Sequence, residues 1–75
     1  MTSWQTMNSK DVWLGFEAAL VRRGVKRTDM ARAMEISERT LTERRKHPGD
    51  VSLREIEKAL NKYSIPIREI FDYGN

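Results

Sequence analysis

Residues 27–46, RTDMARAMEISERTLTERRK, decide the fold of this 75-residue chain. Apolar residues recur at helical spacing in both halves of the stretch; they are Met30, Ala31, Met34, Ile36 and Leu41. Ser37 suits the N-cap of the second half, because its hydroxyl can accept a hydrogen bond from a free amide of the first helical turn. Between Met34 and Ser37 there is room only for a tight turn. The stretch therefore predicts two short helices joined as a helix-turn-helix, a unit whose second helix enters the major groove of DNA.

The same stretch resembles the helix-turn-helix of the lambda-repressor-like (Cro and XRE) family. That family commonly shows Leu-Ala on the first helix and then a small turn that ends in Gly-Val-Ser or Gly-Ile-Ser. An apolar residue follows four positions after the Ser. The matching elements here are Met30-Ala31, Glu35-Ile36-Ser37 and Leu41. Similar residues continue through positions 51–53, 56, 59–60 and 63–65, so the resemblance covers about residues 12–71. It implies an all-α, compact domain of four to five helices.

The resemblance also implies a function and a partner. We expect a sequence-specific, DNA-binding transcriptional regulator of the Cro or repressor type, of phage or bacterial origin. Such a protein would bind double-stranded operator DNA as a homodimer in the cytoplasm of a bacterial host cell. The alternative is a phage-encoded protein-binding module, an inhibitor or antirepressor, that uses the same fold, because a fold does not determine a function.

Four residues depart from the family pattern. Glu35 stands where the family usually has Gly, which predicts either an altered turn or a left-handed backbone at Glu35. Lys26 replaces the Ser or Thr that usually caps the first helix of the unit, and Arg44 replaces an apolar residue that usually packs inward. Arg27 replaces a frequent Gln near the phosphates, and its charge favours stronger binding to the DNA backbone.

The remaining helices follow from apolar stripes and end signals. Residues 1–8 lack periodicity and are expected to form a flexible arm, with the domain at 9–75. A first helix is predicted from about residue 9 or 10 to 23, ended by Gly24 in the left-handed conformation. Thr28 is a possible cap of the next helix. Ser52 and Glu55 form the pattern of a capping box that begins a later helix. The apolar face of that helix is expected to be Leu53, Ile56, Ala59, Leu60 and Tyr63.

The C-terminal segment has two possible roles. Pro66 fits the first position of a short last helix, whose apolar edge is Ile67, Ile70 and Phe71. In the resembled family this end often pairs two subunits, so these three residues are the expected dimer interface. Packing of the same residues within the monomer is equally compatible with the sequence.

Composition excludes several classes of protein. The chain has no Cys and one His, and it contains no Gly-rich phosphate loop and no cluster with metal-ligand spacing. We therefore expect no enzyme, cofactor, metal or small-molecule substrate. No apolar run approaches the roughly 20 residues that span a bilayer, and the N-terminus lacks the apolar segment of a signal peptide. These features predict a soluble protein without a membrane partner.

Positive charge is concentrated in one part of the chain. Residues 22–46 hold nine Lys or Arg and four Asp or Glu, whereas the remainder holds five basic and seven acidic residues. A clustered basic face is typical of a phosphate-binding surface. The same charges are equally compatible with an ordinary solvated helix surface.

The resemblance assigns roles to the residues around Leu41. With Leu41 facing inward, the family pattern places base-reading side chains at Glu38, Arg39 and Glu43, with Thr40 to one side. An Arg can donate two hydrogen bonds to guanine, and a Glu can accept one from the cytosine amino group. Carboxylates also repel phosphates, so Glu38 could equally serve the helix dipole and Glu43 an intrahelical pair. Phosphate contacts are expected from Arg27, Thr28, Thr42, Arg45 and Lys46.

Overall fold

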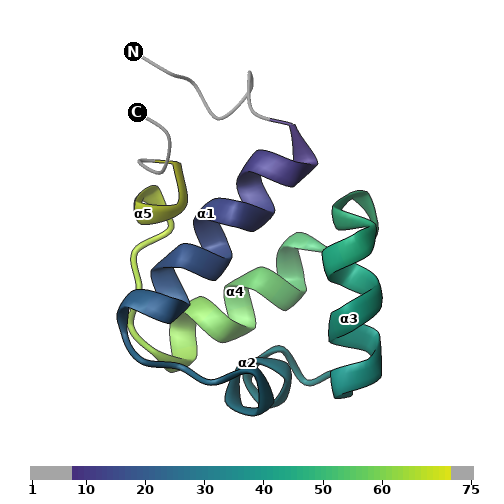
Figure 1. Cartoon of the computed structure of the whole chain (residues 1–75). Coiled ribbons are helices and arrows are strands. Elements are labelled where there is room, and N and C mark those ends of the chain that lie inside the picture. Colours follow the sequence, from purple (N-terminus) through teal and green to yellow (C-terminus); the bar gives the residue numbers. More distant parts are fainter. Residues whose placement is uncertain (1–7, 72–75) are drawn as a thin grey trace.

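The computed structural model describes residues 8–71, and these fold into α-helices joined by short turns (Figure 1). In chain order the elements are α1 (Ser9–Arg22), α2 (Arg27–Met34), α3 (Glu38–Lys46), the 3-10 turn η2 (Pro48–Asp50), α4 (Leu53–Lys62) and α5 (Arg68–Phe71). No strand occurs in the described part. The all-α prediction is confirmed, and α2 and α3 are the two short helices predicted within residues 27–46. The predicted arm lies outside the described residues, apart from Asn8.

Local side chains define where the helices begin. Asn8 belongs to the domain and not to the arm, because its Oδ1 accepts a hydrogen bond from the amide of Asp11 at 2.9 Å and caps α1. The predicted capping box of α4 is confirmed, with Ser52 and Glu55 exchanging bonds of 3.1 and 3.0 Å. Thr28 does not cap α2, because the N-cap residue is Lys26, which makes no side-chain capping bond. Pro66 also lies outside α5, which begins at Arg68.

Three helices end in the same way, with one left-handed residue followed by an apolar one. The left-handed residues are Gly24, Glu35 and Ser64, with φ of 74°, 61° and 54°. In each case the amide of the next residue donates to the carbonyl five positions back; these bonds join Val25 to Leu20, Ile36 to Ala31 and Ile65 to Leu60 at 3.1, 3.0 and 2.9 Å. The apolar residue is thereby turned towards the core, and each chain reversal is short.

Glu35 is therefore in the left-handed conformation, one of the two possibilities that the sequence left open. A side chain with a Cβ is strained there, whereas glycine is not. We expect Glu35→Gly to raise the free energy of unfolding by about 0.5–1 kcal/mol, after the greater freedom of glycine in the unfolded chain is subtracted. The lost ion pair with Lys58, 3.2 Å long and exposed, subtracts little.

Urea denaturation of the two proteins measures this effect. The same substitution at Glu57, inside α4, is the control and should lower the free energy of unfolding by about 1 kcal/mol. A loss of stability in both variants would show that the left-handed backbone at Glu35 carries no strain.

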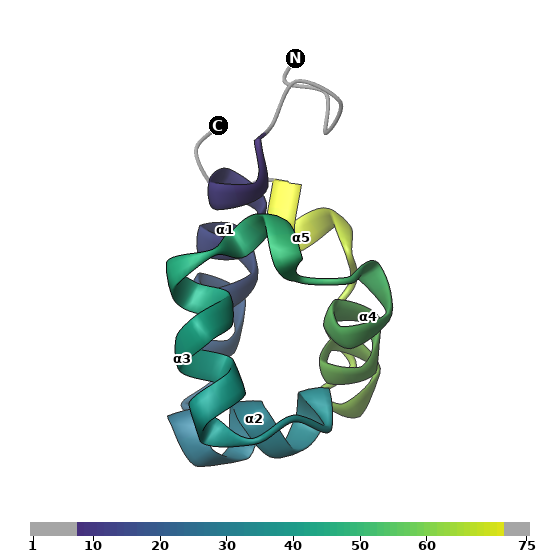
Figure 2. The same ribbon diagram turned by 90° about the vertical axis from the view of Figure 1, so that its right-hand side faces the viewer.

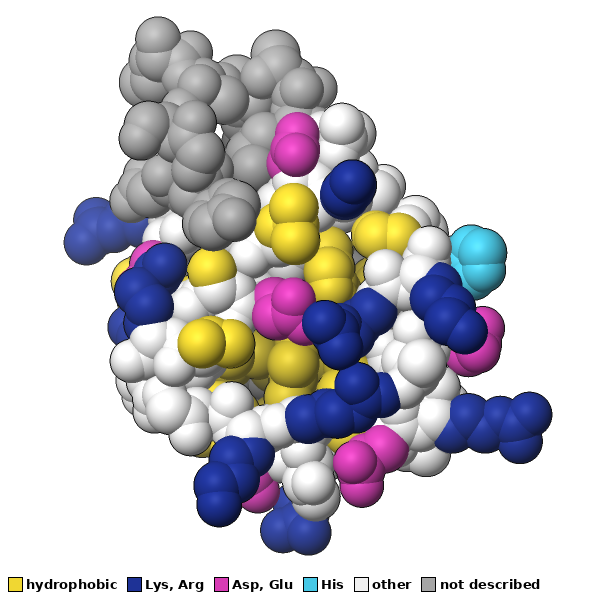
Figure 3. All heavy atoms as spheres, viewed as in Figure 1, with side chains coloured by type: hydrophobic (Ala, Val, Ile, Leu, Met, Phe, Trp, Pro, Cys, Tyr) yellow, Lys and Arg dark blue, Asp and Glu magenta, His cyan; other side chains and the backbone are white. Residues whose placement is uncertain are grey.

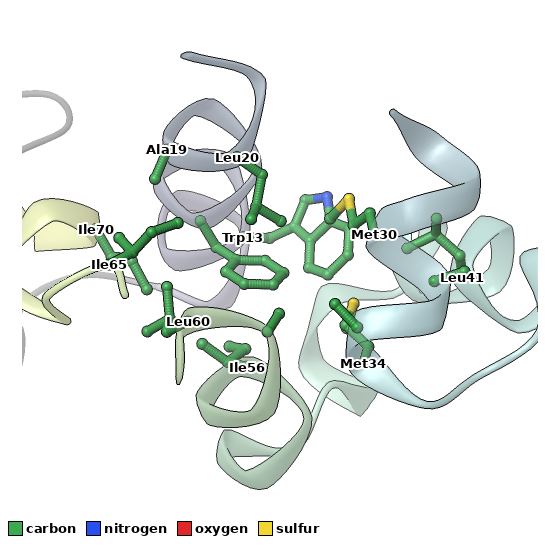
Figure 4. Packing of buried hydrophobic residues seen from close by; sticks show 14 residues of the cluster. Trp13, Ala19, Leu20, Met30, Met34, Leu41, Ile56, Leu60, Ile65 and Ile70 are labelled. Carbon is green, nitrogen blue, oxygen red and sulfur yellow. The ribbon is translucent and has the colours of Figure 1, made fainter. Parts of the chain in front are cut away.

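One apolar cluster holds the helices together (Figure 4). At its centre the rings of Trp13 and Phe16 are tilted, with centroids 5.5 Å apart. The cluster draws on every α-helix; its buried members are Trp13, Phe16, Ala19, Leu20, Met30, Ala31, Ala33, Met34, Leu41, Ile56, Ala59, Leu60, Ile65 and Ile70. Of the predicted apolar face of α4, Tyr63 is partly buried against the cluster. Leu53, at the first position of α4, is 60% exposed, so its assignment to that face is wrong.

The helices surround this cluster in a fixed order. In Figure 1, α1 and α4 run through the middle, with α5 beside α1, α2 at the bottom and α3 along one side. The perpendicular view shows α3 and α4 on opposite sides, with α2 lying across the bottom between them (Figure 2). Contacts of α2 with both α4 and α3 fix this corner of the domain. Helix α3 therefore stands at the edge of the molecule with one long side towards solvent.

The C-terminal helix is tied to α1 by charge as well as by packing. Glu69 accepts bonds from Arg23 at 2.6 and 3.0 Å and from Arg22 at 2.9 Å. These hydrogen bonds from Arg23 and Arg22 lower the pKa of Glu69 to about 2. The next residue, Ile70, is 1% exposed and belongs to the apolar cluster. Ile70 therefore packs within the monomer's own core, the second of the two roles that the sequence left open for this segment.

Candidate nucleic-acid interface

Helix α3 is polar on most of its surface and is attached through a single buried side chain. Leu41 is 1% exposed and is the only buried residue between Glu38 and Lys46. The predicted N-cap is confirmed: the hydroxyl of Ser37 accepts from the amide of Thr40 at 3.0 Å. Residues 35–37 form the whole connection from α2. The turn, the cap and one leucine together orient the helix.

The solvent side of α3 carries three charged residues. Arg39, Glu43 and Lys46 are exposed and lie three or four positions apart, so they share one face opposite Leu41. Their side chains make no ion pair or hydrogen bond to the part of the chain that the structure describes. The intrahelical pairing of Glu43 with Arg39 or Lys46, one of the sequence's alternatives, is absent there. We call these three residues the outer face of α3.

Two arginines hold the flanks of α3. Arg44 donates from Nε and Nη2 to the two carboxylate oxygens of Glu55, both at 3.3 Å, and so joins α3 to α4. Burial raises the pKa of Glu55, but the hydrogen bonds from Arg44 and Ser52 outweigh it, and the pKa lies below its usual value. Arg44, which replaces an inward apolar residue of the family pattern, thus anchors the helix through an ion pair.

Arg45 lies on the opposite flank. Its Nε is 3.0 Å from Oε2 of Glu17, so this pair joins α3 to α1. The side chains of Arg45 and Glu17 are 47% and 23% exposed. Arg45 was predicted to contact phosphate, and in the free chain it faces a carboxylate of its own protein.

The start of α2 meets the start of α3. Arg27 donates from Nη2 to the hydroxyl of Thr42, and its Nη2 also lies 3.5 Å from the carbonyl of Glu38. Thr42 in turn donates to that carbonyl at 3.1 Å. Arg27 and Thr42, predicted separately as phosphate contacts, therefore lie side by side. Thr28 is exposed in the adjacent turn.

The two remaining base-reading candidates differ in exposure. Glu38 is exposed, and its carboxylate makes no hydrogen bond or ion pair within residues 8–71. Thr40 is half-buried, and its hydroxyl accepts from Ser37 Oγ at 2.9 Å. The structure thus places Arg39 and Glu43 together on the solvent side, Glu38 near Arg27, and Thr40 against the cap.

Ion pairs within the protein neutralise much of the positive charge of residues 22–46. Four of the nine basic residues at 22–46 pair with carboxylates from outside that segment, namely Arg22, Arg23, Arg44 and Arg45. Sequence reasoning missed their partners Glu17, Glu55 and Glu69, because no linear signal joins residues on different helices. Lys and Arg still gather over α2 and α3, with Asp and Glu among them (Figure 3).

The C-terminal candidates for pairing are divided by the fold. Ile67 is 44% exposed, whereas Phe71 is half-buried against the core. Ile67 also lines a shallow cleft with Leu60, Ile65 and Pro66. Only Ile67 of the three predicted interface residues is therefore largely open to solvent.

The described residues contain neither a metal-ligand cluster nor a membrane-spanning helix. Within 8–71 no group of three or more His, Cys, Asp or Glu side chains is placed to hold a metal ion. None of the described helices is long and apolar enough to cross a membrane. Comparison of the chain with family models, with curated proteins and with solved structures gives no match.

Proposed function

We propose that this chain binds duplex DNA and reads its sequence with α3 in the major groove, as a transcriptional regulator of the Cro or repressor type. One observation carries the proposal: Arg39 and Lys46 stand exposed and unpaired on the outer face of α3 within the described domain. The opposite side of α3 is anchored by Leu41. A helix anchored on one side and charged on the other is suited to presenting side chains to a groove.

The connection to α2 supports the same proposal. Helices α2 and α3 are joined by residues 35–37 alone, the short connection that a helix-turn-helix requires. Because α2 lacks a side-chain cap, its first amides have no partner from the N-cap side chain. Free amides at a helix N-terminus favour a phosphate. Arg27 and Thr28 beside them would add charge and a hydroxyl donor, giving a contact that positions the protein without reading bases.

Base reading is assigned to the outer face of α3. Arg39 would donate two hydrogen bonds to O6 and N7 of guanine. Glu43, one turn away, would accept from the amino group of cytosine. Lys46, at the last turn, would face a phosphate, and its charge would offset the repulsion between Glu43 and the DNA backbone. Glu38 is a second candidate for a cytosine contact.

A single recognition helix reads only a few base pairs, so we propose a homodimer. Two-fold pairing would place two α3 helices about 34–36 Å apart on one side of the duplex. Ile67 is an exposed apolar candidate for the pairing surface. The site of action would be the cytoplasm of a bacterial host cell.

Selection of bound duplexes from a random pool tests the proposal. We expect a palindromic consensus that contains G·C pairs, because Arg39 and the carboxylates favour guanine and cytosine. Affinity for that consensus should fall steeply with salt, with a slope of about −0.9 per phosphate contact. Absence of binding to any duplex at about 0.15 M salt, a concentration at which specific complexes persist, would contradict the proposed function.

A second candidate function follows from the exposed carboxylates of Glu38 and Glu43. Two acids on one short helix suit a basic protein surface as well as cytosine, so α3 could bind a protein partner. Capture of a stable protein partner that Glu43→Lys abolishes, together with no retention of DNA, would favour this module over the regulator.

A further inference from the structure

The two flanking arginines of α3 are held by ion pairs of different character. Arg44 makes two bonds to Glu55, and the side chains are only 27% and 17% exposed. Glu55 also caps α4 through Ser52, so this pair belongs to the framework of the domain. Arg45 pairs with Glu17 through Nε at 3.0 Å, and its side chain is 47% exposed.

This pairing leaves most of the Arg45 guanidinium unused. A guanidinium carries five N–H donors, and the ion pair with Glu17 is formed through Nε, 3.0 Å from Oε2. Neither Nη atom has a hydrogen bond to the described part of the protein. Water screens an ion pair that is this exposed, so the pair is weak and can exchange its carboxylate for another anion.

We propose that Glu17 competes with a DNA phosphate for Arg45, and so sets the affinity and salt dependence of DNA binding. This inference rests on the proposed function. Arg45 follows directly after Arg44 and before Lys46 on α3, and Glu17 faces α3 from α1. The face that carries these two helices shows carboxylates between Lys and Arg side chains (Figure 3).

The consequence is electrostatic. A cation that its own protein neutralises displaces few counterions from DNA, so it adds little to the salt dependence of binding. While Arg45 is paired with Glu17, it makes no contact with a DNA phosphate. Glu17 thereby keeps the affinity below the value that the number of basic residues would support, and makes release from non-specific DNA easier.

A double-mutant cycle with Glu17→Gln and Arg45→Gln tests this. In the otherwise unchanged full chain, Glu17→Gln should raise affinity for the selected duplex about fivefold at 0.15 M salt, and steepen the salt slope by about 0.9, the effect of one more phosphate contact. In the Arg45→Gln background the same change should alter affinity by less than about twofold, because the competing group is gone. Glu57→Gln, an exposed acid on α4 with the same change of charge, is the control and should leave affinity unchanged.

Each outcome decides between the two proposals. Equal gains from Glu17→Gln with and without Arg45 would mean a general effect of charge and would overturn the competition. Loss of affinity in Glu17→Gln, with an unchanged midpoint of thermal unfolding, would mean that Glu17 positions Arg45 and would also overturn it. Neither of these two outcomes contradicts the proposed function, because the wild-type chain still binds DNA in both. A wild-type chain that binds no duplex would overturn the proposed function and this inference together.

Discussion

Leu41→Ala is expected to lower the free energy of unfolding by about 2–5 kcal/mol. The leucine is 1% exposed and is the one buried side chain of α3, so its removal leaves a cavity that no other residue of that helix can fill. A domain of this size has little stability to lose, since about 5 kcal/mol is the lower end for folded proteins. Urea denaturation followed by circular dichroism measures the loss.

Leu53→Ala is the matched control for that experiment. Leu53 has the same side chain but is 60% exposed, so its truncation should cost less than about 0.5 kcal/mol. Hydrogen exchange adds a second measurement: amides of α3 in Leu41→Ala should lose protection before those of α1. Equal and small losses for the two leucine variants would show that α3 is held by its ion pairs and not by Leu41.

Arg39→Ala is expected to weaken binding to the selected operator about fivefold to 150-fold, which corresponds to the roughly 1–3 kcal/mol of discrimination carried by a two-bond contact to guanine. Binding to random duplex should weaken much less, because Arg39 is assigned to a base and not to a phosphate. The free side chain of Arg39 has no ion pair within residues 8–71, so its removal should leave the fold unchanged. Fluorescence anisotropy with both duplexes measures the ratio.

Two further alanine variants make the assignment of Arg39 specific. Lys46→Ala should weaken operator and random duplex by the same factor and reduce the salt slope by about 1, as expected of a phosphate contact. Arg68→Ala removes an exposed arginine at the start of α5, far along the chain from α3, and should change neither affinity. Equal losses on both duplexes for Arg39→Ala would show that the outer face of α3 contacts only the DNA backbone.

The accuracy of the sequence predictions differed between helix ends and surfaces. Three end signals, Ser37, Ser52 and Gly24, were predicted correctly because each acts within one turn of its own position. Thr28 and Pro66 were not, since neither lies at the predicted helix start. Apolar spacing also placed Leu41 and most of the core correctly. It failed for Leu53, because a residue at the first turn of a helix can extend beyond the body that the helix covers.

The burial of Ile70 and the pairing of the arginines could not be predicted from the sequence. An apolar edge on a short last helix has the same pattern whether it packs inward or pairs two subunits, so only its position against α1 decided that Ile70 is buried. The basic cluster at 22–46 likewise has one composition whether or not its charges are neutralised. Which arginines are available to bind a partner depends on the positions of Glu17, Glu55 and Glu69, which lie on other helices.

By itself, the sequence determined the helices, the caps at Ser37 and Ser52 and the single inward leucine of α3, because backbone hydrogen bonding and apolar periodicity act over a few neighbouring residues. The tertiary structure alone decided which charged side chains form ion pairs within the protein and which remain unpaired in solvent. Coulomb interaction depends on distance in space, and the distances between Arg45 and Glu17, or between Arg44 and Glu55, are set only when α1, α3 and α4 close around the core.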